Sequence, residues 1–275
     1  MLLRRLIWCA LALALAVGSL QFALQRWQAV PLILAAEVFE EQKAEAPEAA
    51  EHEHAHADAD AHDHAHEEVH EHAHDHGAGA WEPADGVERG FWTWVANVLN
   101  AMAMALLVLV VASVAVWRRA APVGWRTLAA IAAAGWLSLH FWPSLGLPAE
   151  LPGMDAPALH QRQAWWLLSA ASAAGACALL GFGSRAWRWP AAAALLALPF
   201  LVGAPQGGDA LAGFSGNARE QMQSLEQQFV WATAWLALAF WASLGAAALP
   251  LFRRFLQPLL LAGRSGAAQP LAARA

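Results

Sequence analysis

The sequence predicts an all-α integral membrane protein, with about six transmembrane helices and a disordered external loop rich in His, Asp and Glu between helices 1 and 2. Of the 275 residues, 59% are hydrophobic and only 14% are charged, whereas a soluble domain has about 25% charged residues. Six apolar stretches also come close to the ~20 residues that a spanning helix needs. They lie at about 6–27, 94–117, 125–143, 164–183, 189–204 and 229–252.

These stretches divide the chain into four regions. We expect a first transmembrane helix in 1–30, an external metal-binding loop in 31–93, a five-helix membrane domain in 94–252 and a cytoplasmic basic tail in 253–275. The fifth stretch is short and interrupted by Pro199, so the main alternative topology omits it and places the C-terminus outside. The first stretch has the basic flank of a signal peptide, but its apolar core is long, and we expect it to stay uncleaved.

Basic residues predict which way the helices face, because Lys and Arg gather on the cytoplasmic side of a membrane protein. Six spans and a cytoplasmic N-terminus put all 22 Asp and Glu residues outside. The basic residues that fall inside are Arg4, Arg5, Arg118, Arg119, Arg126, Arg185, Arg188, Arg253, Arg254, Arg264 and Arg274. We therefore expect a bacterial inner-membrane protein with cytoplasmic termini and a periplasmic loop 31–93.

The loop carries a histidine tract, residues 52–76, that we interpret as a metal-binding segment. Neutral imidazole is a strong ligand for first-row divalent metals, and neighbouring carboxylates add oxygen donors. In an extended chain alternate residues point the same way, so an H-x-H-x-H run can present several imidazoles to one ion. The candidate metal ligands are His52, His54, His56, His62, His64, His66, His70, His72, His74 and His76.

The composition around the tract predicts disorder in the absence of metal. From Glu37 to Gly79 the chain has few apolar residues, many acids and many alanines. Such a segment cannot bury enough surface to offset the entropy of ordering it. We expect at most a transient helix in residues 48–57, where Ala and Glu favour one.

Few polar residues are available for a path through the membrane. Acids before the second span either form a mouth that receives a cation or are simply solvated. An amide within a span joins helices or lines a pathway, because it must find a partner in the bilayer. We take as candidate ion-path residues Glu82, Asp85, Glu88, Asn97, His140, His160 and Pro199.

Two of these candidates have a plain structural alternative. A lone histidine such as His140 is more often a hydrogen-bonded anchor than a ligand. Pro199 either breaks the fifth helix and exposes carbonyls to an ion, as in some transporters, or merely ends a short helix. The residues alone do not separate these alternatives.

Motifs for enzymatic chemistry are absent from the sequence. It contains no Walker motif, nucleophile elbow, H-E-x-x-H or dinucleotide fingerprint. We therefore expect no catalytic residues, no organic cofactor and no nucleic-acid partner. Transport would be driven by gradients, by the membrane potential or by another subunit.

Several short motifs, in this order around the apolar spans, resemble those of a known family, the predicted cobalt transporter subunit CbtA. The resemblance covers most of the chain. It rests on Pro31-Leu32-Ile33-Leu34 with Glu37, Trp81-Glu82-Pro83-Ala84-Asp85-Gly86 with Glu88-Arg89, Glu150-Leu151-Pro152-Gly153, Arg162-Gln163 with Trp165-Trp166, and Leu198-Pro199 with Val202-Gly203-Ala204-Pro205.

The resemblance implies an inner-membrane protein that imports cobalt in support of cobalamin supply, beside a small single-span partner, CbtB, which has its own histidines. The family often places histidines after the proline of the fifth span and after the Gly-Ala-Pro. Here these positions hold Phe200 and Gln206. If the family's ion path uses those histidines, this chain must use other groups.

The sequence leaves three functional hypotheses. The first is an uptake permease for a divalent transition metal, Co²⁺ in the first place, with the tract capturing the ion. The second is a membrane-anchored metal-binding or buffering protein that delivers ions to a partner permease. The third is a nickel permease, because imidazole binds Ni²⁺ more tightly than Co²⁺ and ligand type also admits Zn²⁺.

Overall fold

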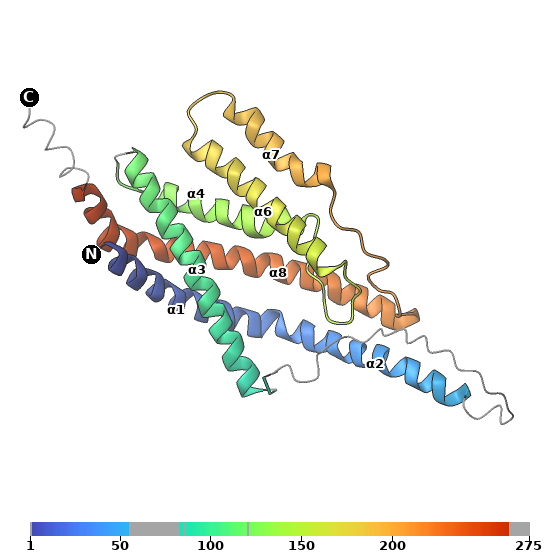
Figure 1. Ribbon diagram of the computed structural model, residues 1–275. Coiled ribbons are helices and arrows are strands. Elements are labelled where there is room, and N and C mark those ends of the chain that lie inside the picture. The colour runs from blue at the N-terminus through green and yellow to red at the C-terminus, as the bar shows by residue number, and fades with distance from the viewer. Residues whose placement is uncertain (1, 55–82, 85, 120, 264–275) are drawn as a thin grey trace, which may run out of the picture.

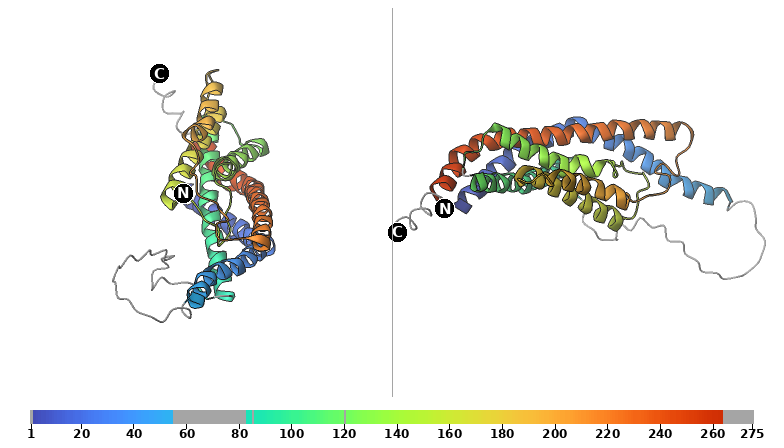
Figure 2. Two further views of the ribbon diagram at one scale, coloured as in Figure 1. Left: turned by 90° about the vertical axis from the view of Figure 1, so that its right-hand side faces the viewer. Right: turned by 90° about the horizontal axis from the view of Figure 1, so that it is seen from above.

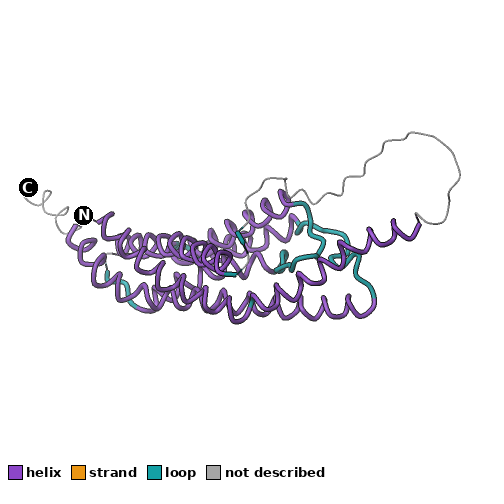
Figure 3. The backbone as a smooth tube through the Cα atoms, turned by 90° about the horizontal axis from the view of Figure 1, so that it is seen from below, coloured by secondary structure: helices purple, strands orange, loops and turns teal. Residues whose placement is uncertain are grey.

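The computed structural model describes residues 2–54, 83–84, 86–119 and 121–263, with only the backbone for 44–54. These residues form helices joined by loops and turns, with no strand among them (Figure 3). The elements are α1 (Leu2–Gln28), α2 (Val30–His54), α3 (Val87–Arg119), α4 (Trp125–Trp136), η1 (Leu137–Phe141), α5 (Trp142–Ser144), α6 (Leu159–Phe182), α7 (Arg188–Val202), α8 (Gly216–Leu251) and η2 (Phe252–Leu256) (Figure 1).

Every apolar stretch identified in the sequence lies in helix, but the described helices differ in their capacity to cross a membrane. Four are long and apolar enough: Leu2–Gln28, Val87–Arg119, Leu159–Phe182 and Gly216–Gly263. The α7 helix is apolar but has only 15 residues, and the third stretch is divided among α4, η1 and α5. The all-helical class is confirmed, whereas six complete spans remain a prediction.

The main core joins α1, α3, α4 and α8 at small residues. Ala10 and Ala14 of α1 and Ala101 and Ala105 of α3 are all 0% exposed. Helices in a bilayer gain little from hiding apolar surface and associate where small residues let their backbones approach. An added Cβ on Gly18 would lie 2.7 Å from Cα of Val98, so α1 and α3 are in backbone contact there.

The α2 helix corrects the expectation of disorder from Glu37 onward: residues 37–54 are helical. Its Ala36 is buried in a cluster with Leu151, Leu211, Phe214 and Met222, which we call the cap cluster. Glu and Ala favour helix, and packing one face supplies the stabilisation that composition alone did not reveal. The remainder of the predicted disordered segment, 55–79, lies outside the described residues.

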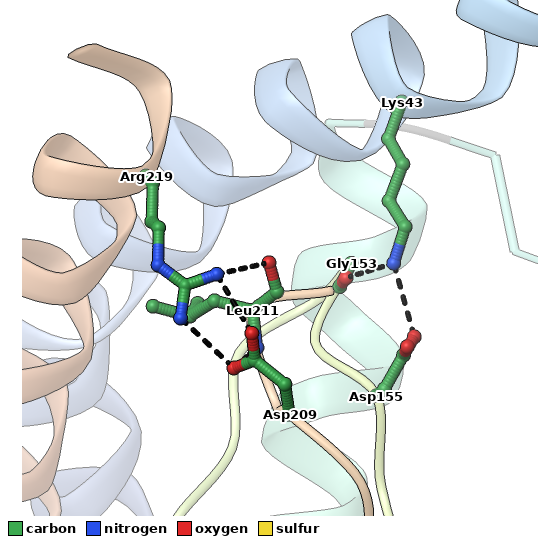
Figure 4. Close-up of polar contacts among 6 residues, drawn as sticks. All are labelled: Lys43, Gly153, Asp155, Asp209, Leu211 and Arg219. Carbon is green, nitrogen blue, oxygen red and sulfur yellow. Dashed lines mark hydrogen bonds and ion pairs between the residues drawn. The ribbon is translucent and has the colours of Figure 1, made fainter. Parts of the chain in front are cut away.

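Polar contacts tie α2 to the same loops (Figure 4). Lys43 Nζ donates hydrogen bonds to the Gly153 carbonyl at 3.2 Å and to Asp155 at 3.0 Å. The backbone N–H of Asp155 donates to the Ala210 carbonyl at 2.9 Å. The loops after α5 and α7 are therefore joined to each other and to α2.

The last helix extends beyond both of its expected ends. It begins at Gly216 rather than at about residue 229, and the chain remains helical through η2 to Gly263. Phe252 and Leu256 are both 0% exposed within the main core. The first residues of the predicted tail 253–275 are therefore part of the packed helix, because their apolar face has a core to enter.

Two widened, π-helical turns share one sequence context. Residues Leu137–Phe141 are followed two positions later by Pro143, and residues Phe252–Leu256 by Pro258. Proline has no N–H to donate and its ring crowds the preceding turn, so the helix widens and the next N–H bonds five residues back. The first of these turns carries His140.

We predict that Gly18→Ala destabilises the fold. The new methyl group would meet the backbone of α3, and overpacking of this kind costs about 1–3 kcal/mol. The measurement is thermal unfolding in detergent. Gly181→Ala in α6 is the control, since a Cβ there meets nothing within 4 Å, and equal melting temperatures for the two variants would contradict the close contact.

Candidate cation site in a polar cavity

A cavity of about 980 Å³ lies among α1, α2, α3 and α8, with η1 contributing to its wall. Residues from the starts of α2 and α3 contribute to its wall, and Figure 2 shows α2 extending away from the N-terminal end of α1. Apolar side chains form most of the wall. The polar or ionisable side chains that line it are Gln21, Gln25, Arg26, Glu37, Arg89, Thr93, Asn97, Asn100, His140 and Thr233.

The polar side chains reach the cavity because they recur at helical spacing. On α3, Thr93, Asn97 and Asn100 line the cavity together with Met104, at intervals of four, three and four residues. On α1, Gln21 and Gln25 are four residues apart. Residues at these intervals share one helix face, and the close approach of α1 and α3 turns the two faces toward each other.

Amide groups meet at the centre of this arrangement. Asn97 is 9% exposed and donates from Nδ2 to Gln25 Oε1 at 2.7 Å and to the Thr93 carbonyl at 2.9 Å. Gln21 is 8% exposed, and its buried Oε1 has no hydrogen-bond partner among the described residues. Asn97 therefore joins α3 to α1 and also lines the cavity, while its role in an ion pathway stays a prediction.

Charged side chains also line the cavity. Arg89 Nη2 donates to Glu37 Oε1 at 2.6 Å, with Glu37 29% and Arg89 45% exposed. Arg26 also lines the cavity. Glu37 is thus the cavity-lining carboxylate among the described residues, and it already faces a guanidinium group.

His140 is brought to the cavity that Asn97 lines, whereas other candidates lie elsewhere. Glu88 and His160 are exposed at the starts of α3 and α6 and are not among the lining residues. The carbonyl of Pro199 accepts the indole N–H of Trp165 at 3.0 Å. The α7 helix continues past Pro199 only to Val202, which favours the second alternative for this residue, a short helix that ends soon after its proline.

The remaining candidates cannot be placed. Glu82, Asp85 and the eight histidines from His56 to His76 lie outside the described residues, and His52 and His54 are described only as backbone in the last turn of α2. Within the described ranges, no group of three or more His, Cys, Asp and Glu could hold a metal ion. The tract's chemistry therefore remains a prediction from sequence.

Sequence reasoning missed Gln21, Gln25 and Glu37 as cavity residues. The i, i+4 spacing of the two glutamines, opposite a polar stripe on α3, was a usable signal. This spacing was overlooked because the sequence of α1 is otherwise almost uniformly apolar and was interpreted only as a first span. Glu37 was assigned to a disordered loop and could be placed only once α2 was known to continue the line of α1.

Three of the contacts join short motifs that are far apart in the sequence. Glu37 pairs with Arg89, Glu150 pairs with Arg162, and the Trp165 indole bonds to Pro199. Each contact connects two of the segments on which the family resemblance rests. The order of these motifs along the chain therefore has a physical basis, because the motifs contact one another where helix ends and loops meet.

Comparison with protein-family models gives a match over residues 3–253 to the family described as probable cobalt transporter subunit (CbtA). The chain belongs to the CbtA family. Searches of curated proteins and of solved structures returned no match. Together with the apolar helices, the family indicates a multi-pass membrane protein that is a transporter subunit.

We predict that the loops beside the cap cluster loosen as the pH falls. Hydrogen bonds from the Arg219 guanidinium and the Leu211 N–H hold the pKa of Asp209 below its ordinary value. A depressed folded-state pKa adds stability above the unfolded pKa, and this stability is lost as the pH falls through the folded value. The protection of the amide hydrogens of residues 205–215, measured by hydrogen exchange and corrected for the pH dependence of intrinsic exchange, should therefore fall on acidification.

Asp209→Asn is the matching variant for this prediction. It removes the carboxylate and should make exchange in the loop faster at neutral pH and nearly independent of pH in the acidic range, after correction for intrinsic exchange. An Asp209→Asn protein with the same acid response as the unmodified chain would show that another group is responsible.

Proposed function

We propose that this chain is an inner-membrane transporter subunit for uptake of a divalent transition-metal cation, most directly Co²⁺. In this proposal the external histidine tract captures the ion and the polar cavity forms part of its path. The observation that carries it is the cavity itself, a polar space among the apolar helices of a CbtA family member.

The position of the tract supports the coupling of capture to the cavity. The chain leaves α2 at His54 and returns at the start of α3, where Gly86 and Arg89 line the cavity. Glu37 of α2 pairs with Arg89 of α3, so the two helices that flank the tract both contribute to the cavity wall.

The orientation inferred from basic residues, with both termini in the cytoplasm, makes the membrane potential a sufficient driving force. Moving a charge across 100 mV is worth about 2.3 kcal/mol, so an inward potential favours entry of a dication by about 4.6 kcal/mol, or about a thousandfold in concentration. The proposal also includes a small single-span, histidine-bearing partner subunit, as the family resemblance implies.

An accessory role is the second candidate function. It is favoured by the shortage of metal-ligating side chains within the described helices, where no cluster of His, Cys, Asp and Glu could hold an ion. A protein of this kind would bind metal outside the membrane and pass it to a partner permease, whichever of Co²⁺ or Ni²⁺ it carries.

We predict that the purified chain, reconstituted into liposomes with an inward-negative potential and co-reconstituted with its single-span partner, accumulates Co²⁺ severalfold over protein-free liposomes. Dissipating the potential should abolish the excess. Metal that binds to the outside of the liposomes but does not enter would support the accessory role instead. Parallel measurements with Ni²⁺ distinguish the nickel permease.

We also predict that deletion of residues 52–76 preserves transport at saturating metal but raises the concentration needed for half-maximal uptake. A tract that concentrates ions at the mouth affects capture and leaves the path intact. Protons compete for imidazole near pH 6.5, so the unmodified chain should lose this advantage on external acidification while the deletion variant changes less. Complete loss of uptake at saturating metal would place the tract in the path.

A further inference from the structure

A second open groove, of about 770 Å³, lies among α3, α4 and α6. Apolar side chains form almost all of its wall. Ala174 and Ala178, one turn apart on α6, both line the groove and are exposed. Among its described lining residues, only Arg119 and Arg126 are charged. The groove is therefore an apolar trough with two guanidinium groups in its wall.

The two arginines stand together at one end of the groove. Arg119 is the last residue of α3, and Arg126 is the second residue of α4. Arg119 Nη2 also donates a hydrogen bond to the carbonyl of Gly181, near the end of α6, at 3.2 Å. The end of α3, the start of α4 and the end of α6 thus meet around these guanidinium groups.

The guanidinium groups lack a carboxylate partner. Neither Arg119 nor Arg126 forms an ion pair with a described residue. The sequence has no Asp or Glu in 89–149 or in 156–208, the stretches that surround the groove. A guanidinium group carries five N–H donors in a planar fork that fits a phosphate, and Arg119 uses one of them for Gly181. This end of the groove is complementary to an anion.

Neighbouring tryptophans place the arginines at the depth of lipid headgroups. Trp117 is 68% exposed and Trp125 is 65% exposed, close to the end of α3 and at the start of α4. Exposed tryptophan is enriched where a membrane meets water. The Arg126 guanidinium lies 5.6 Å from the ring centroid of Trp125, so it shares this level. The anion available there is the phosphate of a lipid.

The length of the groove matches one leaflet of a bilayer. Its lining residues on α3 extend from Arg119 back to Leu107, which is about 18 Å at 1.5 Å per residue. Half of a hydrocarbon core of about 30 Å is about 15 Å. An acyl chain that starts at the headgroup level would follow the groove to the middle of the membrane. A partner helix that spans the membrane would need a face about twice as long.

We propose that this groove binds an anionic phospholipid, with the phosphate at Arg119 and Arg126 and an acyl chain along the apolar wall. Basic pockets between transmembrane helices are known to bind anionic headgroups in this way. The lipid would join α6 to α3 and α4 where the three helices meet. The inference is independent of the metal that the chain carries, and its test involves no transport.

Native mass spectrometry of the full-length chain in detergent tests the proposal. The chain is titrated with phosphatidylglycerol, or with phosphatidylcholine that carries the same acyl chains. We expect phosphatidylglycerol to bind about tenfold more tightly, as for one hydrogen bond to a charged group, because the choline ammonium opposes the two guanidinium groups. Arg126→Gln should lose most of this preference. Arg185→Gln is the matched control, because Arg185 is an exposed arginine at the same end of the bundle and does not line the groove.

Ala178→Phe tests the acyl-chain part of the site. It fills the groove with apolar bulk and leaves both charges in place, so we expect severalfold weaker binding of phosphatidylglycerol. Ala171→Phe is its control, because Ala171 is exposed on the same helix and lies outside the groove. The control should bind the lipid as the unmodified chain does.

Equal affinities of the unmodified chain for the two lipids would overturn the inference. So would displacement of the lipid by glycerol 3-phosphate together with full binding by Ala178→Phe, since this would show an anion site without an acyl-chain groove. A dimer that phosphatidylglycerol leaves intact and Ala178→Phe dissociates would assign the groove to a second copy of the chain instead. If Ala178→Phe does not remain monodisperse, the arginine variants decide, and equal lipid affinity of Arg126→Gln and Arg185→Gln would overturn the inference.

Discussion

Backbone contact between α1 and α3 determines where the polar groups of this protein can meet. Apolar surface gains little by leaving lipid for a helix interface, so close packing must hold the helices together. Gly18 and the alanines around it allow that packing. Beyond the contact the same two faces carry amides, and the helices diverge enough to leave the cavity between them. The site is thus a continuation of the interface.

Because the cavity continues a helix interface, amide side chains are the most numerous of its polar groups. Amides serve both as links between helices and as acceptors, whereas carboxylates or imidazoles in the same places would be costly to bury without a permanent partner. Asn97 shows the first use through Gln25. In the proposed path, amides would hold a cation weakly, which suits release at the far side better than tight coordination would.

The sequence was sufficient for the helical class, the family and the apolar character of the helices. It was insufficient wherever tertiary packing decided the outcome. The α2 helix depends on the cap cluster, and Phe252 and Leu256 depend on a core supplied by other helices. Gln21 and Gln25 can be identified as cavity residues only when α3 is known to lie opposite them. The widened turn at His140 follows from Pro143, but the direction in which it turns the side chain could not be predicted from the amino-acid sequence alone.

The α2 helix determines how far from the helix bundle the histidine tract begins, because His52 and His54 lie in its last turn. Its 25 residues span about 37 Å at 1.5 Å per residue, and Figure 1 shows it projecting beyond the other helices roughly in line with α1. Surface charge on a membrane is screened within about 8 Å at physiological ionic strength. In the proposed orientation, the far end of α2 would therefore lie in bulk solution, away from the diffuse layer in which anionic lipid headgroups enrich every dication alike.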